Sequence, residues 1–261
     1  MKLILAVFIA FVATSVSAHE FWIETERSKY DIGEPIVGNL YVGEDASGTA
    51  LAYLPRNFTA FNFVDGDGSV RTVEGRIGDR PALNIAANSD GLGIFQYETT
   101  DSQITWRSSE QFQNFLEYDG LPHIARQHIE RGLPPSGFSE LFSRHIKALV
   151  LVGDGTGEDI KIGMPIEIVA LDNPLTVPAA SNFDVQVFWQ DQPNPDIQVA
   201  LFHRAVDGSV TRHIVKTDRS GVAQIPNQGR GFYLVSTVDM LPVESGPAVW
   251  KSYWASLTFH R

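Results

Sequence analysis

The chain has 261 residues, of which 43% are hydrophobic and 20% are charged, a composition that indicates a globular protein and not a disordered one. The formal net charge is -11, and no cluster of Lys and Arg offsets it, so the phosphate backbone of a nucleic acid would be repelled. The absence of cysteine excludes disulfides, thiolate ligands and a cysteine nucleophile, which leaves His, Asp, Glu or the amino terminus to hold a metal ion.

The first 18 residues have the pattern of a secretory signal peptide. Lys2 is the only charged residue, an apolar run extends from Leu3 to Val12, and the small-residue stretch "TSVSA" ends at Ala18. The apolar run is well short of the roughly 20 residues that cross a bilayer. We therefore expect cleavage after Ala18, a periplasmic protein and no membrane span in the mature chain. An uncleaved anchor is the alternative.

Residues 19–174 are predicted to form an N-terminal β-sandwich domain. Short alternating apolar runs separated by Gly, Pro and Asp predict strands and turns over most of this part. A helical insertion is expected at about 109–132, because Phe112, Phe115 and Leu116 recur at helical spacing behind a serine cap. The strand at 144–153 is apolar on both faces, which places it in the interior of a layered fold.

Residues 175–261 are predicted to form a second, C-terminal β-sandwich domain after the stretch "LDNP". The segment "FDVQVFWQ" alternates strictly, and a hairpin is expected around Asp207-Gly208. The predicted fold class is therefore mainly β, with two Ig-like or prealbumin-like β-sandwich domains.

Several motifs resemble known families. The stretch "TDRSGVAQIPNQGRGFYLV" at 217–235 is similar to the Asp-x-x-Gly turn and Gly-x-Tyr strand of prealbumin-like and carboxypeptidase-regulatory-like domains. Together with "AHEFWIE", "YDIGEPI", "FSRHIKALVLVG", "GMPIEIVALDNP" and "WKSYWASLTF", it resembles a bacterial exported family of unknown function described as nickel- or cobalt-uptake associated (NikM-like). The resemblance covers nearly all of residues 19–261. It implies a periplasmic protein that handles transition metals, with a membrane metal transporter as a possible partner.

His19 would be the first residue of the mature protein. An α-amine has an ordinary pKa of about 8 and an imidazole one of about 6.5. Both groups of His19 can therefore lose their protons close to neutral pH and chelate one metal ion. Nitrogen ligands of this kind favour copper, then nickel, among the divalent ions of the first transition row. We expect His145, on the interior strand, or His260, near the end of the chain, to supply a second imidazole. The alternative is that His19 only begins the first strand.

Two basic residues of the interior strand are candidate ligand-binding residues. Arg144 and Lys147 match recurring basic positions of the resembling family, in which another residue usually stands at the place of His145. They are predicted either to bind an anion or a carboxylate, or to form buried ion pairs with Glu117 or Glu140.

The remaining histidines are predicted to lie outside a metal site. If Asp207 and Gly208 form a two-residue turn, His203 and His213 lie on opposite faces of their hairpin. His123 and His128 are five residues apart on the second predicted helix, which separates them by roughly 140° around its axis. We expect both to be surface or capping residues.

The sequence contains no serine-hydrolase motif, no phosphate-binding loop motif and no dinucleotide-binding motif. The sequence therefore predicts non-catalytic binding of nickel, cobalt or copper in support of uptake or homeostasis. Two alternatives remain open. A terminal histidine resembles the histidine brace of copper-dependent oxidative enzymes, and the five tryptophans suit a sugar-binding or adhesion module.

Overall fold

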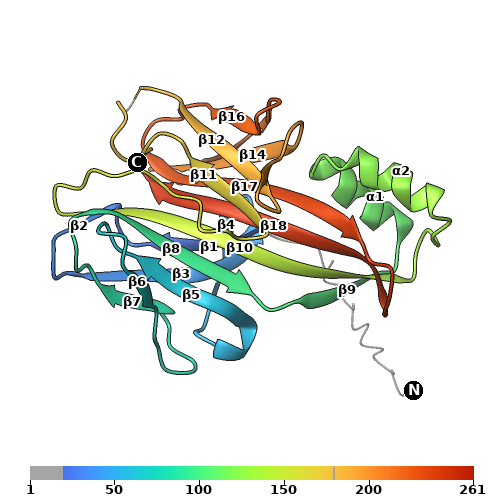
Figure 1. The fold of residues 1–261 in the computed structure, drawn as a ribbon, viewed down its shortest axis with the longest axis horizontal. Helices are drawn as coiled ribbons and strands as arrows, with labels where there is room; N and C mark the ends of the chain where they lie inside the picture. The colour runs from blue at the N-terminus through green and yellow to red at the C-terminus, as the bar shows by residue number, and fades with distance from the viewer. Residues whose placement is uncertain (1–19, 179) are drawn as a thin grey trace, which may run out of the picture.

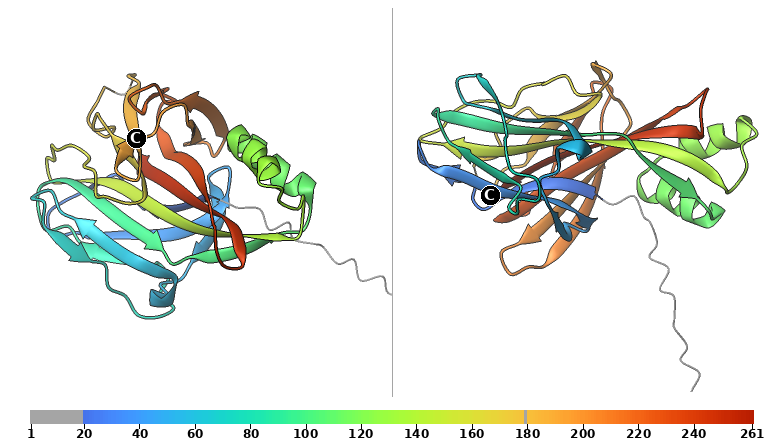
Figure 2. Two further views of the ribbon diagram at one scale, coloured as in Figure 1. Left: turned by 45° about the vertical axis from the view of Figure 1, so that its right-hand side comes forward. Right: turned by 90° about the horizontal axis from the view of Figure 1, so that it is seen from below.

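The computed structural model describes residues 20–178 and 180–261, which form three β-sheets and two short α-helices (Figures 1 and 2). The predicted fold class, mainly β, is confirmed. The signal peptide and His19 lie outside the described residues. None of the described helices is both long enough and apolar enough to span a membrane.

A ten-stranded sheet runs through the middle of the molecule (Figure 1). Its strands, in spatial order, are β15 (Val210–Lys216), β14 (Gln198–Ala205), β17 (Gly231–Pro242), β18 (Ala248–His260), β10 (Phe138–Val152), β8 (Gly91–Thr99), β5 (Phe58–Val64) and β6 (Val70–Thr72). The short strands β2 (Lys29–Tyr30) and β9 (Ser102–Trp106) also pair with β10.

Two smaller sheets cover this central sheet. The first contains β1 (Glu20–Thr25), β3 (Pro35–Glu44), β4 (Ser47–Leu51) and β7 (Leu83–Ala86), and a 3-10 turn, η1 (Pro55–Asn57), follows β4. The second contains β11 (Ile166–Ala170), β12 (Phe183–Trp189), β13 (Gln192–Pro193) and β16 (Val222–Ile225). The two covering sheets pack through separate clusters of buried side chains.

Strand β10 carries both of these clusters. Ile146, Ala148 and Val150 pack with the β1–β3 sheet, whereas Leu149 and Leu151 pack with the β11–β12 sheet. Because alternate side chains of a strand point to opposite faces, a strand between two covering layers must be apolar on both. The prediction of an interior strand at 144–153 is confirmed.

The central sheet continues across the boundary predicted at residue 174. Strand β18 pairs in parallel with β10 from Ser139 to Ala148, and β11, which precedes the boundary, pairs with β12, which follows it. The two predicted sandwiches thus share one sheet. The boundary itself stays a prediction, which a fragment can test.

The helical insertion lies at one end of the central sheet (Figure 2). It consists of α1 (Ser109–Tyr118), which is capped by the side chain of Ser108, and α2 (Pro122–Glu130). Gly120, at φ +70°, allows the sharp turn between them. Phe112, Phe115 and Leu116 face the core, so the insertion predicted at about 109–132 is confirmed.

One helical histidine differs from its prediction. His128 is buried, and both of its ring nitrogens have partners. Its Nδ1 accepts a hydrogen bond from Trp250 Nε1 at 3.0 Å, and its Nε2 lies 2.9 Å from the carbonyl oxygen of Pro134. The prediction that it is a surface residue is wrong. Its partner Trp250 comes from β18, more than a hundred residues away, so the local helical pattern gave no sign of the contact.

Candidate functional site

Strand β1 carries the chain away from the predicted mature N-terminus. Its first residue, Glu20, directly follows His19 in the sequence and is the first residue that the structure describes. Ser256 Oγ and Thr258 Oγ1 of β18 donate hydrogen bonds to the carbonyl oxygens of Phe21 and Ile23. These bonds hold β1 across the central sheet, so the position of Glu20 is set by the fold.

Arg144 lies beside this end of β1. Its guanidinium carbon is 5.6 Å from the centre of the Phe21 ring and 4.7 Å from that of Phe142. Burial lowers the pKa of Arg144 to about 10, an effect that the negative charge of Glu20 opposes. Of the predicted site residues that the structure describes, Arg144 is the one that it places beside the first residues of β1.

Two carboxyl groups interact electrostatically near this end of β1. Burial raises the pKa of Glu20 to about 7, with Asp45 and Glu44 adding to the effect and Arg212 opposing it. Desolvation also raises the pKa of Asp119 well above its usual range, and Glu20 raises it further. We call Glu20, Tyr118, Asp119, Arg144 and Arg212 the β1 cluster.

The hairpin of β14 and β15 brings Asp119 to this cluster. Arg212 Nη2 donates a hydrogen bond of 2.8 Å to the carbonyl oxygen of Tyr118, and its guanidinium carbon lies 3.7 Å from the centre of the Tyr118 ring. Gln198 Nε2 donates to the same carbonyl at 2.8 Å. The end of α1 is therefore fixed on the hairpin. Sequence analysis missed Asp119 and Arg212, because nothing local links a helix end to a strand more than ninety residues later.

His145 lies on the other face of β10. Its ring is buried, Nδ1 is 3.1 Å from Glu98 Oε2, and Nε2 is 3.1 Å from Ser143 Oγ. Adjacent side chains of a strand point to opposite faces, so His145 points away from the face that carries Arg144. The structure does not bring His145 together with the β1 cluster.

His260 lies near the opposite end of β1. Its Nε2 is 3.7 Å from Glu24 Oε1. Burial lowers the pKa of His260, and a hydrogen bond with the backbone of Thr25 opposes this effect. Thr25 lies five positions after Glu20 along the strand, a distance of roughly 16 Å. His260 also lines a cavity of about 380 Å³ together with Arg204, Arg230 and Arg261. It is therefore distant from the β1 cluster.

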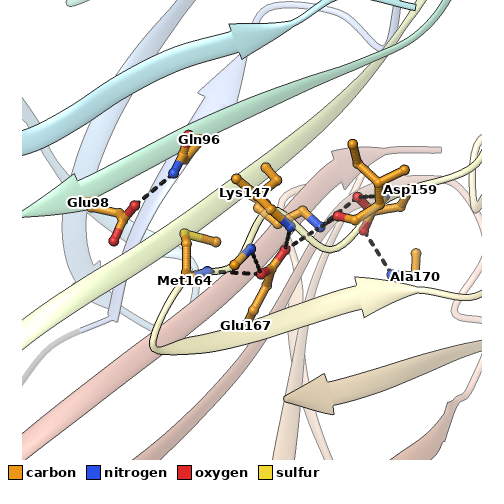
Figure 3. Close-up of polar contacts among 10 residues, drawn as sticks. Gln96, Glu98, Lys147, Asp159, Met164, Glu167 and Ala170 are labelled. Atoms are coloured by element: carbon orange, nitrogen blue, oxygen red, sulfur yellow. Dashed lines mark hydrogen bonds and ion pairs between the residues drawn. The ribbon is translucent and has the colours of Figure 1, made fainter. Parts of the chain in front are cut away.

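Lys147 is fully buried in an ion-pair cluster (Figure 3). Its Nζ lies 2.6 Å from Asp159 Oδ1 and 3.3 Å from Glu167 Oε1. The predicted partner Glu140 instead accepts hydrogen bonds from Trp106 Nε1 and Ser252 Oγ. The expectation of a buried ion pair is thus met for Lys147, but the partners predicted for it were wrong.

Within residues 20–178 and 180–261, no group of three or more His, Asp or Glu side chains is arranged to hold a metal ion. The metal ligand predicted at the mature N-terminus lies outside these ranges. His19, which directly precedes the β1 cluster in the sequence, is the candidate that sequence analysis supplies.

Comparison with known proteins identifies the family. The family model "Domain of unknown function (DUF4198)" matches residues 16–240. The chain belongs to this family. No curated protein matches the DUF4198 chain.

Similar solved structures are distant. They include a tetra-tandem repeat from the extending region of a large adhesion protein (12% identity, TM-score 0.23, 92% of this chain and 49% of that chain). A DUF4785 family protein from Legionella pneumophila is 8% identical, with a TM-score of 0.27 over 85% of this chain and 52% of that chain. The D0-D1 domain of intimin is 13% identical, with a TM-score of 0.21 over 93% and 98%. The DUF4198 chain thus spans about half the length of the first two, and likenesses this weak carry no argument about its function.

Proposed function

We propose that the mature DUF4198 protein binds a divalent transition metal ion, nickel, cobalt or copper, in the periplasm. The α-amine and imidazole of His19 form the chelate, and the protein supports metal uptake or homeostasis with a membrane metal transporter as its partner. The observation that carries this proposal is that two carboxyl groups have raised pKa values: Glu20, which directly follows His19, and Asp119, whose pKa is raised further by the charge of Glu20.

The charges of the β1 cluster suit a cation. The negative charge of Glu20 disfavours the ionised form of Asp119, and a metal ion close to both would remove this penalty. Amine and imidazole nitrogens with one or two carboxylate oxygens are a donor set that nickel, cobalt and copper accept. Asp119 thereby replaces His145 and His260 as the first candidate for a further ligand.

The finer family assignment belongs to this proposal. The motifs that resemble the NikM-like exported family suggest metal handling, and the stretch at 217–235 suggests a prealbumin-like C-terminal domain. Both are supported by sequence resemblance alone.

The test compares the native mature protein with a form that carries one additional Gly before His19. The extension keeps the imidazole but moves the free amine, so copper and nickel affinity, measured by competition with a chromophoric chelator, should fall by about tenfold or more. Equal affinity of the two forms would contradict a terminal chelate. Mass spectrometry of the native protein checks that cleavage occurs after Ala18.

A second pair of variants tests the carboxyl group. Asp119→Asn should weaken metal binding, whereas Asp154→Asn, which alters a fully exposed carboxylate, should not. Oxygen-dependent consumption of a reductant by the copper-loaded protein would favour the oxidative enzyme instead. Retention on a glycan without metal would favour the sugar-binding module.

A further inference from the structure

Lys147, Asp159 and Glu167 form a fully buried ion-pair cluster in the protein interior (Figure 3). All three side chains have no solvent exposure. Lys147 stands in the middle of β10, Asp159 lies in the segment before β11, and Glu167 lies on β11. The Nζ atom of Lys147 lies 2.6 Å from the Asp159 carboxyl group and 3.3 Å from the Glu167 carboxyl group.

Backbone groups hold both carboxyl groups in place. Ala170 N donates to Asp159 Oδ2, and Ile160 N donates to Asp159 Oδ1, each at 2.9 Å. Glu167 accepts hydrogen bonds from the backbone nitrogens of Ile162, Gly163 and Met164. The amine and the two acids therefore have little freedom to move apart, which is the condition under which neighbouring groups react quickly.

The interior disfavours the ionised form of Asp159. Burial raises the pKa of Asp159, although Lys147 opposes the effect. With Asp159 protonated, the transfer of one proton from Lys147 to Glu167 leaves three neutral groups. This neutral form contains a free amine nucleophile against the Asp159 carboxylic acid, with the Glu167 acid 3.3 Å from the amine. It avoids the cost of ions in an apolar interior.

We propose that Lys147 and Asp159 condense to form an intramolecular isopeptide bond, with Glu167 as the group that carries the proton. The Nζ lone pair attacks Cγ of Asp159, and a C–N bond forms. Glu167, which is protonated in this neutral form, donates its proton to the Oδ1 hydroxyl and takes up the proton that Nζ loses; the C–O bond breaks, and one water molecule leaves. No oxidant, reductant or cofactor is needed.

The hydrogen bonds fit this direction of reaction. Oδ1, which faces Lys147, is the oxygen that leaves, whereas Oδ2 stays as the amide carbonyl. Ala170 N already donates to Oδ2, so it stabilises the negative charge that develops there in the tetrahedral intermediate. The amide N–H that forms keeps an acceptor, because the Ile160 carbonyl oxygen lies 2.8 Å from Nζ.

The product is favoured by the same burial. In the unreacted protein Lys147 and Asp159 form an ion pair, and the amide that replaces this pair carries no charge in a site where charge is costly. The bond would close a covalent ring from Lys147 to Asp159 and would tie β10 to the segment that leads into β11. This inference does not depend on the metal-binding proposal, because His19 takes no part in it.

The test is the intact mass of the purified, denatured mature protein. We expect it to be lower than the sequence mass by one water molecule, and tryptic digestion should give a branched peptide that joins the segments around Lys147 and Asp159. Lys147→Arg and Glu167→Gln should each restore the full mass. Lys161→Arg, at a partly exposed lysine that pairs with Asp191, is the matched control and should keep the loss.

Two outcomes would overturn the proposal. The full sequence mass in the wild-type protein would show a permanent ion-pair cluster, and this result needs no variant to fold. A loss of water that persists in Lys147→Arg, or that maps to an Asp-Gly sequence, would show cyclisation of an aspartate instead.

Discussion

His203 and His213 share one face of the β14–β15 hairpin. His203 is paired with Thr211 and Leu201 with His213, so the two imidazoles are diagonal neighbours. The Nε2 atom of each is buried and has no hydrogen-bond partner among the residues that the structure describes. The prediction that these histidines lie on opposite faces is therefore wrong.

This pair predicts a dependence of stability on pH. Burial lowers the pKa of His203 below the usual 6.5, and His213 lowers it further. The unfolded chain then binds a proton more readily than the folded one, so this contribution to stability is present above about pH 6.5 and is lost as the pH falls through the folded pKa.

We expect His203→Phe to reduce the loss of unfolding free energy between about pH 7 and pH 5, since phenylalanine does not titrate. Urea denaturation at a series of pH values measures the effect. His123→Gln, which changes a partly exposed histidine, is the control and should keep the wild-type slope. An unchanged slope in His203→Phe would show that His203 is not protonated more readily on unfolding.

The hairpin also shows where sequence analysis stops. The dipeptide Asp207-Gly208 correctly marks the turn, but Ala205 N bonds to Ser209 O and Gly208 has φ +86°, so the loop contains three residues and not two. One extra loop residue moves every side chain of one strand to the other face. Asp-Gly suits both loop lengths, and no local signal separates them.

Long-range partners were the other limit. The two-sided pattern of β10 and the helical spacing at Phe112 and Phe115 follow from local periodicity, so both were predicted correctly. The partners of Lys147 and the approach of Asp119 to Glu20 depend on how distant segments meet, which periodicity does not encode. Candidate residues could be found from the sequence, but their grouping into sites could not.

Glu140 gives a prediction of opposite sign. Burial raises its pKa from 4.5 to about 7, although Ser252 and Trp106 donate hydrogen bonds to it. The folded state therefore binds a proton that the unfolded state releases, and this contribution to stability falls as the pH rises from about 4.5 to about 7. Glu140→Gln, which has the shape of the protonated acid, should flatten this part of the stability curve.

Glu117→Gln is the control for that experiment, because Glu117 is exposed on α1. Both curves come from chemical denaturation at fixed temperature. Glu140→Gln could instead lower the free energy of unfolding at every pH and keep the wild-type dependence on pH. Glu140 would then be ionised in the folded protein, which would contradict the prediction.

Arg144 is expected to stabilise the fold, although it lies near the candidate site. Arg144→Ala removes the cation that opposes the charge of Glu20 and the contacts with Phe21 and Phe142. Removal of one member of a buried pair of opposite charges costs about 3 kcal/mol or more, so the unfolding free energy should fall by about this amount. Arg144→Lys, which keeps the charge, should lose less. Unchanged stability with weaker nickel or copper binding would assign Arg144 to the site alone.

The last prediction concerns the boundary at residue 174. A fragment of residues 175–261 lacks β10, which pairs with β18 along ten residue pairs, and lacks β11, which pairs with β12. The buried cluster around Phe183 and Leu257 also loses Ile94, Leu149 and Ile168. Removal of several large apolar side chains from one cluster costs several times the 2–5 kcal/mol of a single truncation, roughly the whole stability of a small domain. We therefore expect the fragment to show no cooperative urea transition by circular dichroism, whereas the mature chain does. A cooperative transition of the fragment would establish residues 175–261 as an independent domain, and the pairing between β10 and β18 would then be a contact between two domains and not part of one core.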